Sequence, residues 1–293
     1  MERPISKNTL YISGTARFHD LIYLIAKDRG LAEQEIEHTR FIAFYRLKFA
    51  HMGDRNWSAV DVCVAKNPIE KMVAVGEDGN VFTYVGGNST DEIIEPKPIT
   101  LRRLGAIDGF SYACGMKRQV YKRIDENKWI PMHAPLPNPN ESVGFEAISG
   151  FSQNEIYAVG WNGEIWEWNG STWLNHGSPT NLILTGVCCG DNQTVYICGQ
   201  NGTIIRGRHD TWELMEFEDI FDDFWDIIWF NNTFYVATMN MIFQLVNNYL
   251  IPVSFGDDSP RTCYRLTQAE DVLWSVGDSD IFAFDGTNWV RID

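Results

Sequence analysis

The sequence lacks the features that would assign it to a membrane or to a common enzyme class. No apolar run approaches the roughly 18 residues that a membrane-spanning helix needs, and the N-terminal segment has no apolar core like that of a secretory signal. Motifs of serine hydrolases, zinc peptidases, P-loop proteins and dinucleotide-binding proteins are absent. The six cysteines include no CxxC pair, which favours buried, reduced thiols. We therefore expect a cytoplasmic protein that is not an enzyme.

Basic residues are also scarce. The chain has 24 Lys and Arg against 39 Asp and Glu, for a formal net charge of -15. A protein of this charge repels nucleic acid and anionic membrane surfaces, and it attracts basic partners. The six histidines share no position in the repeat described below. We therefore predict no metal site and no cofactor.

What the sequence does have is an internal repeat. A short apolar stretch that ends in glycine, a tight turn, a second apolar stretch and a tryptophan recur along the chain. Gly160 and Gly199 lie 39 residues apart, and two further steps of 39 reach Thr238 and Gly277. The tryptophans, of which Trp173 is one, share one position of the repeat. We interpret them as packing residues between repeats and not as a binding platform.

Each repeat is predicted to form four short antiparallel strands. Asn162-Gly163 and Asn201-Gly202 supply the residue types that a two-residue hairpin turn requires. Four strands in about 40 residues, repeated several times, are typical of a β-propeller. We predict an all-β, single-domain propeller over residues 1–293 with seven blades, of which residues 57–293 form six regular repeats. Six blades plus an N-terminal extension is the alternative.

The first 56 residues depart from the repeat. Tyr11–Gly14 resembles the glycine-ending stretch, but it lies 62 residues before Gly76, one period plus about 23 residues. Residues 26–38 favour a helix, and residues 41–49 are compatible with helix or strand. We predict an irregular first blade, residues 1–56, with a short helical insertion. Because few residues precede Gly14, an inner strand in this blade and the closure of the ring are left open.

The pattern Y-A-V-G-x-x-G-x-I-x-x-x-N-G-x-x-W at residues 157–173 resembles the repeats of bacterial β-propellers of the broad Kelch-like and WD-like kind. The likeness extends from Gly76 to Trp289. The recurring Gly-His and Trp-Asp pairs of WD repeats are absent, since no Gly-His occurs and Trp-Asp occurs once, at Trp225-Asp226. Gly86-Gly87 is the one Kelch-like diglycine. The resemblance therefore implies an architecture and no particular function.

One face of the expected propeller is predicted to bind a partner. The segment that enters each blade and the turn between its second and third strands share one face, and most of these segments are acidic. In residues 216–226, six acids alternate with five large apolar residues. Apolar anchors ringed by acids suit a basic protein, and a solvated loop is the alternative. The predicted partner-binding residues are Glu216, Glu218, Asp219, Phe221, Asp222, Asp223, Phe224, Trp225, Asp226, Glu77, Asp78, Asp278 and Asp280.

These features predict a non-enzymatic binding protein whose acidic loop face holds a basic protein. Nuclease surfaces are basic because they hold phosphates, so the most specific version is an immunity protein that neutralises a bacterial toxin such as a nuclease. The alternative is a propeller enzyme or a glycan-binding protein that uses the central channel. Acids, arginines or histidines that converge on one cavity between the inner strands would favour this alternative.

Overall fold

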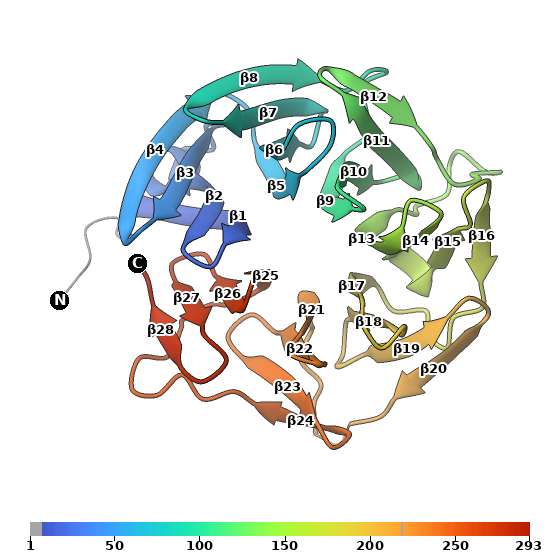
Figure 1. The fold of residues 1–293 in the computed structure, drawn as a ribbon. Coiled ribbons are helices and arrows are strands. Elements are labelled where there is room, and N and C mark those ends of the chain that lie inside the picture. Colours follow the sequence, from blue (N-terminus) through green and yellow to red (C-terminus); the bar gives the residue numbers. More distant parts are fainter. Residues whose placement is uncertain (1–7, 218) are drawn as a thin grey trace.

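Seven four-stranded antiparallel sheets surround a central axis in the computed structural model, which describes residues 8–217 and 219–293 (Figure 1). Each blade consists of four consecutive strands, the first innermost and the last outermost. The predicted seven-bladed propeller is confirmed, and the six-bladed alternative is wrong. Blades 1 to 3 contain β1 (Thr9–Phe18), β2 (Leu21–Asp28), α1 (Arg29–Glu33), β3 (Thr39–Tyr45), β4 (Lys48–Arg55), β5 (Ala59–Ala65), β6 (Lys71–Gly76), β7 (Asn80–Val85), β8 (Asn88–Ile93), β9 (Leu101–Ile107), β10 (Phe110–Gly115), β11 (Gln119–Asp125) and β12 (Lys128–Pro131).

Blades 4 to 7 follow the same plan, and a 3-10 turn at Trp161–Gly163 stands between the second and third strands of blade 4. Their strands are β13 (Phe145–Ser152), β14 (Glu155–Gly160), β15 (Ile165–Trp168), β16 (Trp173–His176), β17 (Leu184–Cys189), β18 (Val195–Gly199), β19 (Ile204–Arg208), β20 (Thr211–Met215), β21 (Asp226–Phe230), β22 (Thr233–Ala237), β23 (Ile242–Val246), β24 (Tyr249–Pro252), β25 (Arg265–Ala269), β26 (Val272–Val276), β27 (Ile281–Phe284) and β28 (Trp289–Arg291).

The glycine of the repeat ends the second strand of a blade because the chain entering the same blade passes directly against it. A Cβ atom at Gly160 would lie 2.0 Å from the carbonyl oxygen of Gly144, which no side chain tolerates. The turn that follows has positive φ angles of 59° at Asn162 and 71° at Gly163, as the Asn-Gly pair predicts. The repeat spacing therefore reports a packing constraint that recurs from blade to blade.

The apolar core consists of clusters that lie between neighbouring blades. The repeated tryptophans belong to these junctions. Trp129 Nε1 donates a hydrogen bond to Glu92 Oε2 in the preceding blade (3.3 Å), and Trp173 Nε1 donates to the carbonyl oxygen of Met132 after the preceding blade (2.7 Å). The interpretation of these tryptophans as packing residues is confirmed.

Blade 1 is complete, and this corrects the alignment predicted for its sequence. Gly14 lies within the innermost strand β1, so Tyr11–Gly14 is not the glycine-ending second strand. That place belongs to β2, which ends at Asp28. The helical insertion is reduced to the single turn of α1, where Asp28 Oδ1 accepts a hydrogen bond from the Leu31 amide. Residues 39–45 form strand β3 and do not extend the helix.

The ring closes by packing, without exchange of a strand between the chain ends. Figure 1 shows blade 1, in blue, beside blade 7, in red. The Tyr11 amide donates to the carbonyl oxygen of Asp278 (2.9 Å), and the Tyr264 hydroxyl donates to the carbonyl oxygen of Tyr11 (2.7 Å). The Ala16 amide donates to Thr267 Oγ1 (3.0 Å), and an apolar cluster from both blades fills the junction.

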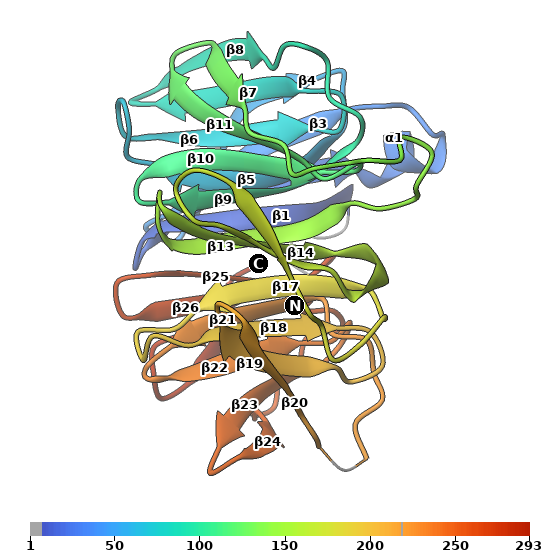
Figure 2. The same ribbon diagram turned by 90° about the vertical axis from the view of Figure 1, so that its right-hand side faces the viewer.

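The antiparallel strands give the ring two different faces. The connections between blades and the turns between second and third strands emerge on one side, which we call the loop face. The remaining turns emerge on the other side, the hairpin face. The helix α1 projects from the loop face, at the right-hand edge of Figure 2. In the part of the chain that the structure describes, no helix is long and apolar enough to cross a membrane.

Candidate partner-binding surface

The connection between β20 and β21 on the loop face contains most of the predicted binding residues and is held firmly by backbone hydrogen bonds. The Gly202 amide donates to the carbonyl oxygen of Asp222 (2.9 Å), and the Phe224 amide donates to that of Gly199 (3.1 Å). Gly202 has a φ of 69°, and a Cβ atom there would lie 2.1 Å from the carbonyl oxygen of Ile220. The connection therefore docks on the hairpin turn of blade 5, and its exposed side chains are presented by a fixed backbone.

The apolar residues of this connection divide into two sets. Phe217, Ile220 and Phe224 pack into the core between blades 5 and 6. In contrast, 70% of Phe221 and 40% of Trp225 is exposed to solvent. Large aromatic side chains held in solvent by an ordered backbone are the usual anchors of a protein interface. These two residues are therefore the strongest contact candidates in the segment.

Two methionines extend the exposed apolar surface and were missed by the sequence analysis. Met239 and Met241 occupy the β22–β23 turn of blade 6 and are 46% and 40% exposed. The Trp225 amide donates to the carbonyl oxygen of Ala237 at the start of this turn (2.8 Å), which places the turn beside Trp225. The sequence signal for this surface was the presence of two methionines in a predicted hairpin turn, where side chains are usually exposed. The loop-face patch, as we define it, comprises Phe221, Trp225, Met239 and Met241 with the exposed acids Glu216, Asp219, Asp222 and Asp223.

Three predicted binding residues are buried, and the structure removes them from the surface. Phe224 is fully buried in the core, and Asp226 is 9% exposed within the central channel. Asp280 is 1% exposed, accepts hydrogen bonds from the Arg261 and Thr262 amides, and pairs with Arg291. The alternation of acids and apolar residues in residues 216–226 could not reveal that Phe224 and Asp226 are buried, because a connection between blades has no fixed side-chain period. Glu218 lies outside the described residues.

The remaining predicted acids lie on the loop face but do not form one continuous patch. Glu77 and Asp78 are exposed in the β6–β7 turn of blade 2, where Asp78 pairs with Lys97 (2.9 Å). Asp278 lies in blade 7 and accepts hydrogen bonds from Thr262 and from Ser279. Blade 1 separates these two groups. The structure therefore favours the loop-face patch over the dispersed acidic turns.

Negative charge alone does not distinguish the two faces. Asp191, Asp210 and Asp271 are exposed in turns of the hairpin face. The loop-face patch differs from these turns because its acids lie in the same connection as the large exposed side chains Phe221 and Trp225. This combination, and not the net charge of -15, is what an interface with a basic protein needs.

The central channel contains the kind of cluster that would favour the alternative function. Asp61, Arg103, Asp226 and Arg265 come from four inner strands and face one cavity. Arg103 Nη2 donates to Asp226 Oδ1 (3.0 Å), and its Nε lies 4.0 Å from Asp61 Oδ2. Burial lowers the pKa of Arg103, but the neighbouring carboxylates outweigh this effect and raise it overall. The two acids and Arg103 thus stabilise one another within the fold, and this pairing is typical of structural residues.

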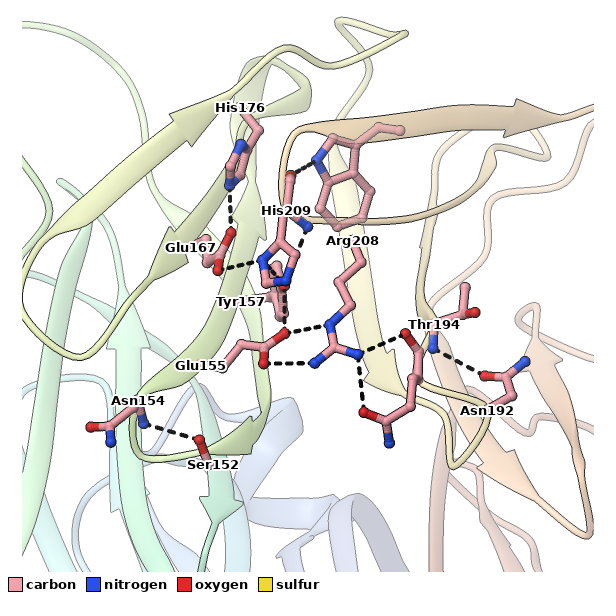
Figure 3. A network of polar contacts seen from close by, with 12 residues as sticks. Ser152, Asn154, Glu155, Tyr157, Glu167, His176, Asn192, Thr194, Arg208 and His209 are labelled. Carbon is pink, nitrogen blue, oxygen red and sulfur yellow. Dashed lines mark hydrogen bonds and ion pairs between the residues drawn. The ribbon is translucent and has the colours of Figure 1, made fainter.

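A second polar cluster joins blades 4 and 5 at the hairpin face (Figure 3). Glu167 lies between two histidines, with distances of 2.8 Å to His176 Nε2 and 2.9 Å to His209 Nδ1. Glu155 receives two hydrogen bonds from the Arg208 guanidinium, at 2.7 and 2.8 Å. Ligand atoms of Glu155, Glu167 and His209 lie within 4.8 Å of one another, as a metal site would require. Because Arg208 already supplies positive charge to Glu155, we interpret the cluster as an ionic tie between blades.

Comparison with solved structures shows the fold. A virginiamycin B lyase from Staphylococcus aureus with quinupristin matches with a TM-score of 0.74 at 14% identity, covering 94% of each chain. YCF48 bound to a D1 peptide matches with a TM-score of 0.71 at 12% identity, covering 96% of this chain and 93% of that one. The WD40 propeller of Doa1 matches with a TM-score of 0.68 at 14% identity, covering 97% and 94%. These structures support the resemblance to β-propellers in general, but not to the Kelch or WD family in particular.

No protein-family model matches the chain. One curated protein, however, is similar along its whole length. The immune protein Tsi7 of Pseudomonas aeruginosa is 41% identical over 303 aligned residues, which cover 99% of this chain and 98% of that protein. Such identity over entire chains shows common descent and a common fold. The chain therefore belongs to the family of the immune protein Tsi7.

Proposed function

We propose that this protein is a non-enzymatic immunity protein that acts in the cytoplasm and neutralises a toxin by binding it through the loop-face patch. The observation that carries the proposal is the full-length similarity to an immune protein. The patch supplies a matching surface, because it combines exposed aromatic and methionine side chains with four exposed acids. Such a surface suits a partner whose binding face is basic with apolar pockets.

A nuclease toxin is the partner that this charge pattern suits best. A nuclease must hold a polyphosphate chain, so basic residues surround its active site. An acidic protein that covers those residues blocks substrate binding without any chemistry of its own. Charge attraction would also accelerate the encounter between the two proteins, and salt would weaken that attraction.

The proposal is tested by a charge reversal on the loop-face patch. The protein is used to capture its partner from the source cell, and affinity for the purified partner is then measured by calorimetry at two salt concentrations. We expect the triple change Glu216→Lys, Asp219→Lys and Asp222→Lys to weaken binding at least tenfold. We also expect it to abolish protection of cells that produce the toxin.

The matched control carries the same change in charge on the hairpin face. Asp191→Lys, Asp210→Lys and Asp271→Lys replace three exposed acids in turns of that face. Binding and protection are expected to persist in this control. If the loop-face variant also binds normally, the patch is not the interface. If both variants lose affinity equally, net charge and not the patch governs binding.

The charged cluster of the channel does not favour an enzyme over this proposal. The cavity measures about 290 Å³, at the lower limit of the roughly 300–1,000 Å³ of ligand pockets. Its two carboxylates are occupied by hydrogen bonds within the protein. The likeness to the lyase rests on 14% identity and extends to the fold alone.

A further inference from the structure

The central channel is enclosed by all seven inner strands and contains a cavity of about 290 Å³. Figure 1 looks down its axis, with β1, β5, β9, β13, β17, β21 and β25 around it. The charged side chains of the cavity lie near the beginnings of β5, β9, β21 and β25, where the strands leave the loop face. The charged end of the channel therefore faces the same side of the ring as the loop-face patch.

Both oxygens of each carboxylate in the channel accept a hydrogen bond from the protein. Asp61 accepts from the Ser13 hydroxyl (2.6 Å) and from the Leu104 amide (2.9 Å). Asp226 accepts from Arg103 (3.0 Å) on one oxygen, and the Leu266 amide donates to its other oxygen (3.0 Å). Each aspartate thus ties its inner strand to the next blade, and these contacts explain its burial.

Arg265 is the second arginine of the channel, and it takes no part in the hydrogen bonds of the two aspartates. Within residues 8–217 and 219–293, its guanidinium makes no hydrogen bond or ion pair, and its Nε is buried without an acceptor. Burial lowers the pKa of Arg265 and the positive charge of nearby Arg103 lowers it further, and the carboxylates of Asp61 and Asp226 offset these two effects only in part. A buried donor without an acceptor costs free energy, and a guanidinium costs more than a neutral group. An anion in the cavity would remove this cost.

We propose that the central channel binds a small anion, a carboxylate or a phosphate group, on the guanidinium of Arg265. The planar fork of a guanidinium donates two parallel hydrogen bonds to either group. The cavity accommodates an inorganic phosphate or a single side-chain carboxylate with a few waters. This site depends neither on the loop-face patch nor on the identity of any toxin.

The test measures unfolding of the isolated protein while inorganic phosphate, acetate or chloride is titrated at constant ionic strength. We expect phosphate or acetate, but not chloride, to raise the unfolding temperature in a saturable way, since a ligand of the native state stabilises it. A rise in unfolding temperature with acetate identifies a carboxylate as the ligand of Arg265, and a bound protein could supply that carboxylate from one of its side chains. A response to phosphate alone identifies a free phosphate. Equal effects of all three salts would overturn the proposal.

Arg265→Gln distinguishes this site from general salt effects. We expect the unfolding temperature of this variant to no longer rise with added phosphate or acetate, because its affinity for the anion is at least tenfold weaker. In the absence of the anion its stability should be close to that of the unsubstituted protein, because the repulsion by Arg103 and the attraction by Asp61 and Asp226 are lost together. The control is Arg206→Gln, which removes an exposed arginine paired with Glu213 and should keep the response. A stable Arg265→Gln protein that still responds would overturn the proposal, and so would a variant that folds only with lower stability and an unchanged response.

Discussion

The two ends of one short segment on the loop face contain acids with opposite roles. Asp222 is exposed, and its side chain forms no hydrogen bond or ion pair with the described residues. Asp226, four positions later, is 9% exposed and accepts hydrogen bonds from Arg103 and from two backbone amides. The neighbouring aromatics divide in the same way, because Phe224 is buried and Trp225 is partly exposed. Whether a residue of this segment belongs to the binding surface or to the core therefore depends on whether its side chain faces solvent or the interior of the propeller, and not on its residue type.

The largest effect is expected at the buried acid. Asp226→Ala leaves Arg103 charged and without its closest partner, and removal of one member of a buried pair costs about 3–5 kcal/mol. We expect a loss of this size in the free energy of unfolding, measured by urea titration with circular dichroism. The matched variant Asp222→Ala should change that free energy by less than about 0.5 kcal/mol. Similar losses in the two variants would contradict the division of the segment.

The adjacent aromatics test the same division through two different measurements. Phe224→Ala opens a cavity in the core and should lower the free energy of unfolding by about 3–5 kcal/mol. Trp225→Ala should cost less than about 1 kcal/mol of stability, but it should weaken partner binding by about 2 kcal/mol if Trp225 is an interface anchor. Urea titration and calorimetry give the two quantities. Normal partner affinity in Trp225→Ala would remove this residue from the interface.

The sequence predicted the blades well because each blade repeats one constraint. The close approach of the chain to Gly160 recurs at Gly199, where a Cβ atom would lie 2.6 Å from the carbonyl oxygen of Ile183. Blade 1 was misaligned because its second strand ends at Asp28, next to α1, and not at a glycine before a tight turn. In blade 1 the repeat pattern therefore matches at Gly14, which lies on the innermost strand.

The candidate surface was predictable only in part. The position of the acidic segment between two blades followed from the repeat, and so did the face on which it lies. Which side chains point outward depends on the hydrogen bonds of Gly202 and Trp225 with neighbouring turns. No periodicity encodes such tertiary contacts. The charged channel was missed for a similar reason, since Asp61 and Asp226 lie 165 positions apart in the sequence and meet only when the ring closes.

An intermediate case sharpens the comparison between exposed and buried acids. Glu155 is 18% exposed and Arg208 is 29% exposed, and together they tie blade 4 to blade 5 (Figure 3). Burial by itself raises the pKa of Glu155, but hydrogen bonds from Arg208 and Tyr157 outweigh this effect and lower it below the ordinary value of 4.5. The tie should therefore be worth more than a surface ion pair and less than the contacts of Asp226.

Arg208→Gln should lower the free energy of unfolding by about 1 kcal/mol at pH 7. The tie stabilises the protein while Glu155 is ionised, so its contribution is complete above the pKa of the unfolded chain. That contribution disappears as the pH falls through the lowered pKa of the folded state. Urea midpoints of both proteins should therefore converge on acidification below about 4.5. A difference that persists at low pH would instead assign the effect to packing, because the Arg208 guanidinium lies 4.5 Å from the ring centre of Phe151.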